Sequence, residues 1–130
     1  MKTLNIFLTK ENKIKIGDLG VAKIMENIEN FATSKVGTPY YLSPEVCEDR
    51  PYNNKSDIWS LGCILYEMCT LKHPFEAKTQ AALLLKIIKG KYESIPRIYS
   101  RSLGEIVHQC LARDYKKRPK ISEVLMMDVV

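Results

Sequence analysis

The sequence comprises 130 residues, 45% of them hydrophobic and 27% charged, which is enough for one domain with its own core and too short for two. The formal net charge is +5, but Lys and Arg are interspersed with Asp and Glu along the whole chain. The composition therefore predicts a soluble protein, with a mild preference for acidic ligands such as nucleotides and no nucleic-acid partner.

Two short runs near the start of the chain predict a β-hairpin. Residues 4–8 and 13–16 are rich in branched and aromatic side chains, and the polar residues 9–12 join them. Two strands alone are marginally stable in water, so we expect the hairpin to pack on the helices that follow.

A loop and a short helix are predicted next. Residues 24–36 have no sustained period, which indicates a mobile loop. Pro44 suits the first position of a helix, because its ring fixes a helical backbone angle, and Ser43 can cap that helix. We therefore expect one helical turn over residues 43–47.

The following helix is apolar on two sides. Ser56 or Asn54 can cap its start, and Pro74 is expected to end it. A helix with two apolar faces belongs in the middle of a core. Its faces are formed by Leu61, Ile64, Leu65 and Met68 on one side, and by Trp59, Cys63 and Tyr66 on the other.

Three further helices are predicted from periodic apolar positions. The first ends at Gly90, where a C-cap glycine would lie. The second opens with a capping-box pair, Ser102 and Glu105. The last begins near Ile121 or Ser122. The apolar faces are Ala81, Leu84, Leu85 and Ile88 in the first helix, and Leu103, Ile106, Val107 and Cys110 in the second.

The cysteines and the apolar segments predict an intracellular, cytoplasmic protein. The four cysteines have no C-x-x-C spacing and lie in or beside apolar stretches, which favours buried reduced thiols over disulfides or a zinc site. The first residues do not form a signal peptide. The most apolar segment, residues 58–71, is interrupted by polar residues and falls short of a membrane span. We therefore expect no membrane partner.

Several motifs occur in the order in which protein kinases carry them. They are Asn5, Asp18-Leu19-Gly20, residues 37–45 (Gly-Thr-Pro-Tyr-Tyr-Leu-Ser-Pro-Glu), residues 56–62 (Ser-Asp-Ile-Trp-Ser-Leu-Gly) and Arg118-Pro119. Together they resemble the C-terminal lobe of a eukaryotic serine/threonine protein kinase, most like the NIMA-related kinases. The resemblance covers residues 1–130, with an activation segment over residues 18–45.

The resemblance implies a mainly α fold, in which a short β-hairpin precedes a helical bundle. It also implies an incomplete domain without the N-terminal lobe, because Met1 takes the position directly after the family's His-Arg-Asp. Kinases of the NIMA-related family are associated with the cytoskeleton, centrosome, cilium and nucleus, and no residue of this sequence indicates which of these applies.

The resemblance further implies a site for ATP and Mg²⁺. Asp18 and Asn5 match the metal ligands, and carboxylate and amide oxygens are the hard ligands that Mg²⁺ prefers. Lys2 matches the catalytic lysine beside the transferred phosphate, and Thr38 matches the residue that bonds that lysine and shapes the substrate pocket. The alternatives are that Asn5 turns the chain, Asp18 caps a loop and Thr38 belongs to an ordinary turn.

Ser34, with Thr33 beside it, matches the regulatory phosphosite of the activation loop. A phosphate adds about −1.5 to −2 charges, which can order a loop against basic side chains. This implies an upstream activating kinase as a partner. Serines are common in loops, so a Ser34 without a regulatory role is an equal alternative.

Three other residues match structural positions of the family. Glu45 and Arg118 resemble the pair that ties the activation segment to the helical floor of the lobe. Asp57 resembles the carboxylate that accepts N–H groups from the His-Arg-Asp segment, and we expect it to lack those partners here. The two histidines have no ligand-like companions, so we assign both to structure.

The printed sequence contains no glycine-rich phosphate loop, no strand lysine for ATP and no catalytic-loop Asp. We therefore expect the complete protein to phosphorylate Ser/Thr of protein substrates and this chain alone to be inactive. The alternatives are a non-catalytic module that docks proteins through the activation segment and residues 81–90, and a truncated gene product. A nucleic-acid-binding helical domain has only the net charge in its favour.

Overall fold

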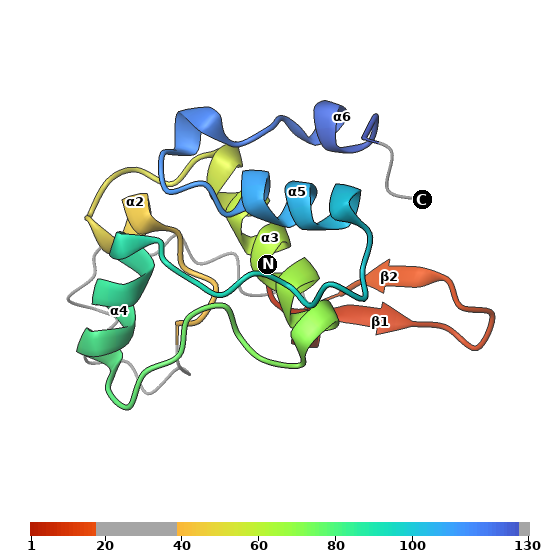
Figure 1. Cartoon of the computed structure of the whole chain (residues 1–130), viewed down its shortest axis with the longest axis horizontal. Helices are drawn as coiled ribbons and strands as arrows, with labels where there is room; N and C mark the ends of the chain where they lie inside the picture. The colour runs from red at the N-terminus through yellow and green to blue at the C-terminus, as the bar shows by residue number, and fades with distance from the viewer. Residues whose placement is uncertain (18–38, 128–130) are drawn as a thin grey trace.

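The computed structural model describes residues 1–17 and 39–127. They form a mainly helical fold with one small hairpin, as the sequence predicts. In Figure 1, α3 runs through the middle, α2 and α4 lie on one side of it and the hairpin projects on the other. The elements are η1 (Thr3–Asn5), β1 (Ile6–Leu8), β2 (Ile14–Ile16), α2 (Pro44–Cys47), α3 (Asn54–Thr70), α4 (Gln80–Lys89), α5 (Arg101–Cys110), η3 (Tyr115–Lys117) and α6 (Ile121–Val124).

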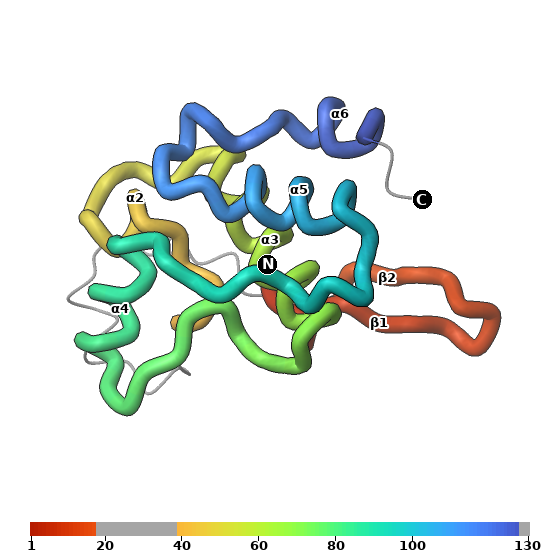
Figure 2. Tube along the Cα trace, viewed as in Figure 1, coloured from red at the N-terminus to blue at the C-terminus, as the bar shows by residue number. Residues whose placement is uncertain are grey.

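The predicted hairpin is confirmed, but its expected packing is wrong. β1 and β2 are antiparallel, with Ile6 opposite Ile16 and Leu8 opposite Ile14. Both strands are shorter than predicted, and residues 3–5 form a 3-10 turn instead of strand. Leu8 and Ile14 are 66% and 67% exposed, because the strands extend away from the helices instead of lying on them (Figure 2).

The helix α3 supplies more of the buried hydrophobic residues than any other described element. Trp59, Cys63 and Tyr66 are buried, which confirms the second of its two predicted apolar faces. The other face is buried only in part: Ile64 is enclosed, whereas Met68 is 64% exposed. The helix α5 packs on α3 through Ile106 and Cys110, which contact Ile58.

The helices α3 and α5 approach each other closely at Gly62. A Cβ atom at this position would lie 2.8 Å from the Cβ of Cys110 and 3.0 Å from the side chain of Leu111. Protein interiors are close-packed and cannot absorb such an overlap without movement of the helices. The missing side chain at Gly62 therefore sets the distance between α3 and α5.

The ends of α3 differ from the prediction. Asn53 is the N-cap, because its Oδ1 accepts a hydrogen bond from the N–H of Lys55 at 2.8 Å. The predicted cap, Ser56, instead completes a capping box by accepting the N–H of Asn53 at 3.2 Å. The helix ends at Thr70, where Leu71 takes a left-handed conformation with φ of 58°, so Pro74 does not end it.

The predicted apolar face of α4 is correct only in part, because Leu84 and Ile88 pack against the core but the centre of the buried face lies elsewhere. Leu83 and Ile87 are fully buried, whereas Leu85 is 59% exposed. Several apolar side chains in succession allow more than one helical face, and contact with the core selects the face that carries Leu83. The predicted C-cap is confirmed, because Gly90 has a left-handed φ of 66°.

The start of α5 also lies earlier than predicted. Ser100 is the N-cap and accepts the N–H of Leu103 at 3.2 Å. Ser102 therefore lies inside the helix, and Glu105 pairs with Arg101 at 2.9 Å instead of closing a capping box. The predicted face with Ile106, Val107 and Cys110 is buried.

The short helix α2 begins at Pro44, as predicted. Ser43 precedes it in an extended conformation, but the side chain of Ser43 makes no capping hydrogen bond. Its hydroxyl is buried and has no partner within the described residues. The fixed backbone angle of Pro44, and not a Ser43 cap, therefore favours this start.

A buried ion pair fastens α2 to the C-terminal part of the chain. The guanidinium of Arg118 donates to both carboxylate oxygens of Glu45, at 2.7 and 2.8 Å, and the two side chains are 0% and 3% exposed. Burial alone would raise the pKa of Glu45, but hydrogen bonds from Arg118 and Ser56 outweigh it and hold this pKa below its usual range. Glu45 is therefore ionised at neutral pH.

The thiols of Cys47, Cys63 and Cys110 are buried and unpaired with one another. Burial raises the pKa of Cys47 to about 12 and that of Cys110 to about 11. Both thiols are therefore neutral in the folded protein.

Among the helices in the described part of the chain, none has the length and apolarity that a membrane crossing needs.

Removing one partner of the buried pair is expected to destabilise the fold strongly. Arg118→Ala should lower the free energy of unfolding by about 3–5 kcal/mol, because it leaves the carboxylate of Glu45 buried and uncompensated. The matched control is Arg113→Ala, because Arg113 pairs with Glu48 at 3.4 Å on the surface, where such a pair is worth at most about 1 kcal/mol. Urea unfolding followed by circular dichroism measures both, and equal effects would contradict the prediction.

Alkaline pH is expected to weaken the fold. Above pH 9 the thiols of the unfolded chain ionise, whereas those of the folded chain stay neutral because burial raises their pKa. Their contribution to stability is therefore complete below about pH 9 and declines as the pH rises towards 11. Urea unfolding at pH 8, 9, 10 and 11 tests this. Cys110→Ala should show a shallower decline, and a free energy of unfolding that stays constant to pH 11 would refute the idea.

Candidate functional site

The short turn η1 carries two of the predicted site residues. Lys2 precedes it with an exposed side chain, and the half-buried Asn5 ends it. The N–H of Asn5 donates to the carbonyl of Lys2 at 3.0 Å, and the carbonyl of Asn5 accepts the N–H of Gly17 at 2.8 Å. The hairpin register therefore brings the residue before Asp18 next to Asn5.

The other predicted active-site and regulatory residues lie outside the described residues. These are Asp18, Thr33, Ser34 and Thr38. The convergence of Asp18 and Asn5 on one metal ion and the regulatory role of Ser34 therefore stay predictions.

A hydrogen-bond network lies beside η1. The hydroxyl of Tyr41 donates to Oε2 of Glu67 at 2.6 Å, and Thr3 Oγ1 hydrogen-bonds to both of these atoms. The three side chains come from η1, from the segment before α2 and from α3. The network therefore joins the start of the chain to the end of the predicted activation segment through the central helix.

Aromatic packing extends this network. The ring of His73 stacks on Tyr40, with centroids 3.9 Å apart and an interplanar angle of 11°, and meets Tyr41 edge-on at 5.5 Å. Its Nδ1 lies 3.6 Å from Oε2 of Glu67. The assignment of His73 to structure agrees with this position, in which it supports the segment that precedes α2.

Burial raises the pKa of Tyr41 above its ordinary value, and the hydrogen bond to Glu67 raises this pKa further. The Tyr41 hydroxyl is therefore protonated at neutral pH and can serve as a donor. A neutral phenol that donates to a carboxylate forms a charge-assisted hydrogen bond, which is stronger than one between two neutral groups.

Asp57 differs from its expected environment. The residue is exposed, and its carboxylate accepts a hydrogen bond from the hydroxyl of Tyr52. Because water reaches it, the carboxylate does not carry the penalty of a buried and unpaired charge.

The cooperation of Thr3, Tyr41 and Glu67 was not predicted from the sequence. Glu67 carried a usable signal, because it is the one charged residue in the apolar stretch from Ile58 to Leu71. A carboxylate in such a stretch needs a polar partner. Its partners lie 26 and 64 residues away along the chain, so spacing alone could not identify them.

Among the described residues, Asn5 and Lys2 carry groups that suit a magnesium nucleotide, but these residues do not form a complete set of metal ligands. Asn5 offers a hard amide oxygen and Lys2 an exposed ammonium group, and no hydrogen bond occupies either side chain within residues 1–17 and 39–127. The same part of the chain holds no group of three His, Cys, Asp or Glu side chains that could bind a metal ion. The predicted metal site also depends on Asp18, which lies outside the described residues.

Comparisons with known proteins identify the family to which the chain is similar. Residues 1–130 match the protein kinase domain family. Serine/threonine-protein kinase Nek4 of Mus musculus is 48% identical over 125 residues, which are 96% of this chain and 16% of that protein. Mouse Nek1 is 48% identical over 96% of this chain and 10% of its own length, and mouse Nek3 is 50% identical over 96% and 24%.

The chain thus spans between a tenth and a quarter of the length of these three relatives. The match extends over the hairpin, the η1 turn and the helices α2 to α6, which are the elements that hold the candidate site together. On these grounds the chain belongs to the protein kinase family, among its NIMA-related serine/threonine kinases.

Proposed function

We propose that this chain forms the metal-binding and substrate-binding part of an ATP-dependent kinase that transfers the γ-phosphoryl group to Ser or Thr of protein substrates. The observation that carries the proposal is the hydrogen bond from the N–H of Gly17 to the carbonyl of Asn5 at 2.8 Å. It holds the strand that leads into Asp18 against the turn that carries Asn5 and Lys2. Asn5 and Lys2 thus lie beside the strand that leads towards Asp18, which itself lies outside the described residues.

Each of these groups has a distinct proposed role. Mg²⁺ supplies counter-charge for the phosphate oxygens. Asp18 and Asn5 hold the ion with hard oxygen atoms, and the ammonium group of Lys2 lies beside the transferred phosphate as a point charge. Thr38 orients Lys2 and shapes the pocket for the substrate hydroxyl.

The activation segment, residues 18–45, is the proposed regulatory element. Phosphorylation of Ser34 or Thr33 by an upstream kinase adds negative charge that pairs with basic side chains such as Lys35. The C-terminal end of this segment is anchored twice, by Tyr41 in the network with Glu67 and by Glu45 in the buried pair.

The open hairpin indicates that further protein or ligand covers it. Leu4, Leu8, Ile14 and Ile16 are between 59% and 80% exposed. Contiguous apolar surface of this kind marks an interaction site. We propose that the nucleotide and the ATP-binding part of the complete kinase lie against this hairpin, and that the protein acts inside the cell, in the cytoplasm.

A non-catalytic docking module is the second candidate. In that case the segment before α2 and the exposed side of α4 would contact partner proteins. Phosphate transfer by the complete protein separates the two candidates.

The complete protein is expected to transfer labelled phosphate from Mg-ATP to casein, and the printed 130-residue chain alone is expected to transfer none. Asp18→Asn should reduce the rate by about a thousandfold or more, because the ion loses a charged ligand. Asp49→Asn is the matched control, since Asp49 has a φ of 60° that Asn tolerates equally well. Full activity of the Asp18 variant would exclude the proposed metal site, and turnover by the chain alone would exclude the proposed inactivity.

The Tyr41 network is expected to affect both activity and stability. Tyr41→Phe removes the hydroxyl that donates to Glu67, which should lower stability by about 1–3 kcal/mol and reduce kcat more than it changes KM for ATP. Tyr115→Phe is the control, because no hydrogen bond of its hydroxyl occurs in the described residues. Kinetics with casein and urea unfolding test the pair of variants, and an unchanged kcat for Tyr41→Phe would show that the network is structural only.

A further inference from the structure

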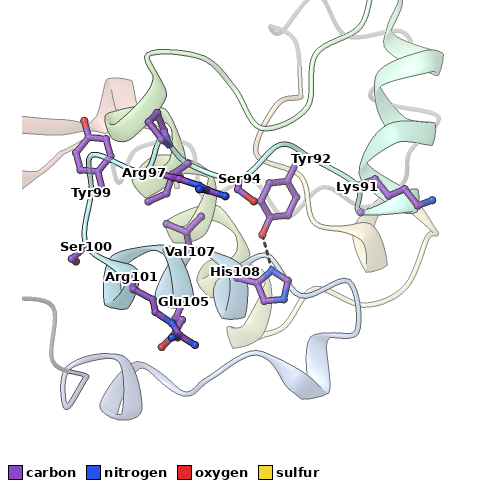
Figure 3. Close-up of a pocket in the computed structure, with 14 residues that line it drawn as sticks. Lys91, Tyr92, Ser94, Arg97, Tyr99, Ser100, Arg101, Glu105, Val107 and His108 are labelled. Carbon is purple, nitrogen blue, oxygen red and sulfur yellow. Dashed lines mark hydrogen bonds and ion pairs between the residues drawn. The ribbon is translucent and has the colours of Figure 1, made fainter.

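A groove separates the loop that follows α4 from the helix α5. It has a volume of about 900 Å³ and is lined by residues 90–92, 94–97 and 99–101 and by the facing side of α5 up to His108, without Glu93 and Ile98. Figure 3 shows Arg97 and Ser94 on the loop side and Arg101, Glu105 and His108 on the helix side. None of the lining residues belongs to η1 or to the hairpin, so the groove is built from other residues than the proposed kinase site.

The walls of the groove are apolar. Ile95, Pro96 and Val107 line it together with the rings of Tyr92 and Tyr99. The position of one ring is fixed, because the hydroxyl of Tyr92 lies 3.3 Å from Nδ1 of His108. A concave site of this volume with apolar walls and a few polar groups is typical of ligand-binding sites in proteins.

The rim of the groove is positively charged. Lys91, Arg97 and Arg101 line it, and Glu105 is the one carboxylate among the lining residues. Glu105 pairs with Arg101 at 2.9 Å, but these side chains are 57% and 93% exposed. An exposed pair is weak, so Arg101 can exchange Glu105 for an acidic ligand at little cost.

We propose that this groove docks an acidic segment of a partner protein that also carries apolar side chains. The carboxylates of the segment would meet Arg97 and Arg101 at the rim, and its apolar side chains would pack between Tyr92 and Tyr99. A nucleic acid fits less well, because the cations do not form a track along which successive phosphates could bind. The proposal is independent of the kinase function, since binding requires neither ATP nor Asp18.

The test uses a short fluorescein-labelled peptide of alternating Asp, Glu, Leu and Phe residues, and fluorescence anisotropy without nucleotide. The full chain should bind this peptide with an affinity that falls as salt is added. The same peptide with Lys in place of every acidic residue should not bind. No binding of the acidic peptide, or equal binding of both peptides, would overturn the proposal.

Variants locate the site. R97E combined with R101E should weaken binding by about tenfold or more, because two attractions become repulsions. K10E is the matched control, because Lys10 is exposed at the tip of the hairpin and its replacement changes the net charge in the same direction. Equal weakening by K10E and by the single variant R97E would show general charge attraction and overturn the site.

Further controls test the folding of the variants and the class of ligand that the groove prefers. Both arginines lie on exposed surface, so the variants should keep the circular dichroism spectrum and Tm of the parent chain. R97Q provides a milder second variant and should weaken binding less than R97E. A single-stranded oligonucleotide of the same net charge that displaces the peptide at lower concentration would assign the groove to nucleic acid and refute the acidic-peptide proposal.

Discussion

The buried pair between Glu45 and Arg118 is the interaction on which the rest of the structure depends. Moving both charges out of water is unfavourable, and such a pair is tolerated only when every polar atom finds a partner. Here Ser56 also donates to Glu45, and the guanidinium of Arg118 donates to the carbonyls of Lys55, Ala112 and Arg113. The guanidinium also lies 4.9 Å from the ring of Trp59. One side chain thus connects α2, the start of α3 and the loop after α5.

Local signals in the sequence predicted most of the helices but not all of their ends or faces. Periodic apolar residues located α5, and a glycine located the end of α4, because both depend on neighbours within one helix. The caps at Asn53 and Ser100 were missed because several adjacent residues could cap each helix. The face of α4 was predicted only in part, because its buried side is selected by contact with the core, which a single segment does not encode.

The candidate site was likewise predicted only in part. Asn5, Lys2, Glu45 and Arg118 were identified from motifs, and the structure brings Glu45 and Arg118 into direct contact. The network of Thr3, Tyr41 and Glu67 was not predicted, because its members are far apart in the sequence and only Glu67 is unusual in its own segment. Tertiary contact creates that network, and contact of this kind has no periodic signature.

The close approach of α3 and α5 at Gly62 restricts which mutations this protein tolerates. A single added methyl group at this position would push against Cys110 and Leu111 and spread two helices that hold most of the core. On the hairpin, by contrast, side chains of many sizes could be exchanged without disturbing any helix. Sequence drift in this chain is therefore expected to be uneven: packing between helices leaves almost no freedom at one small residue, whereas along the two strands only the proposed interaction surface restricts the choice of side chain.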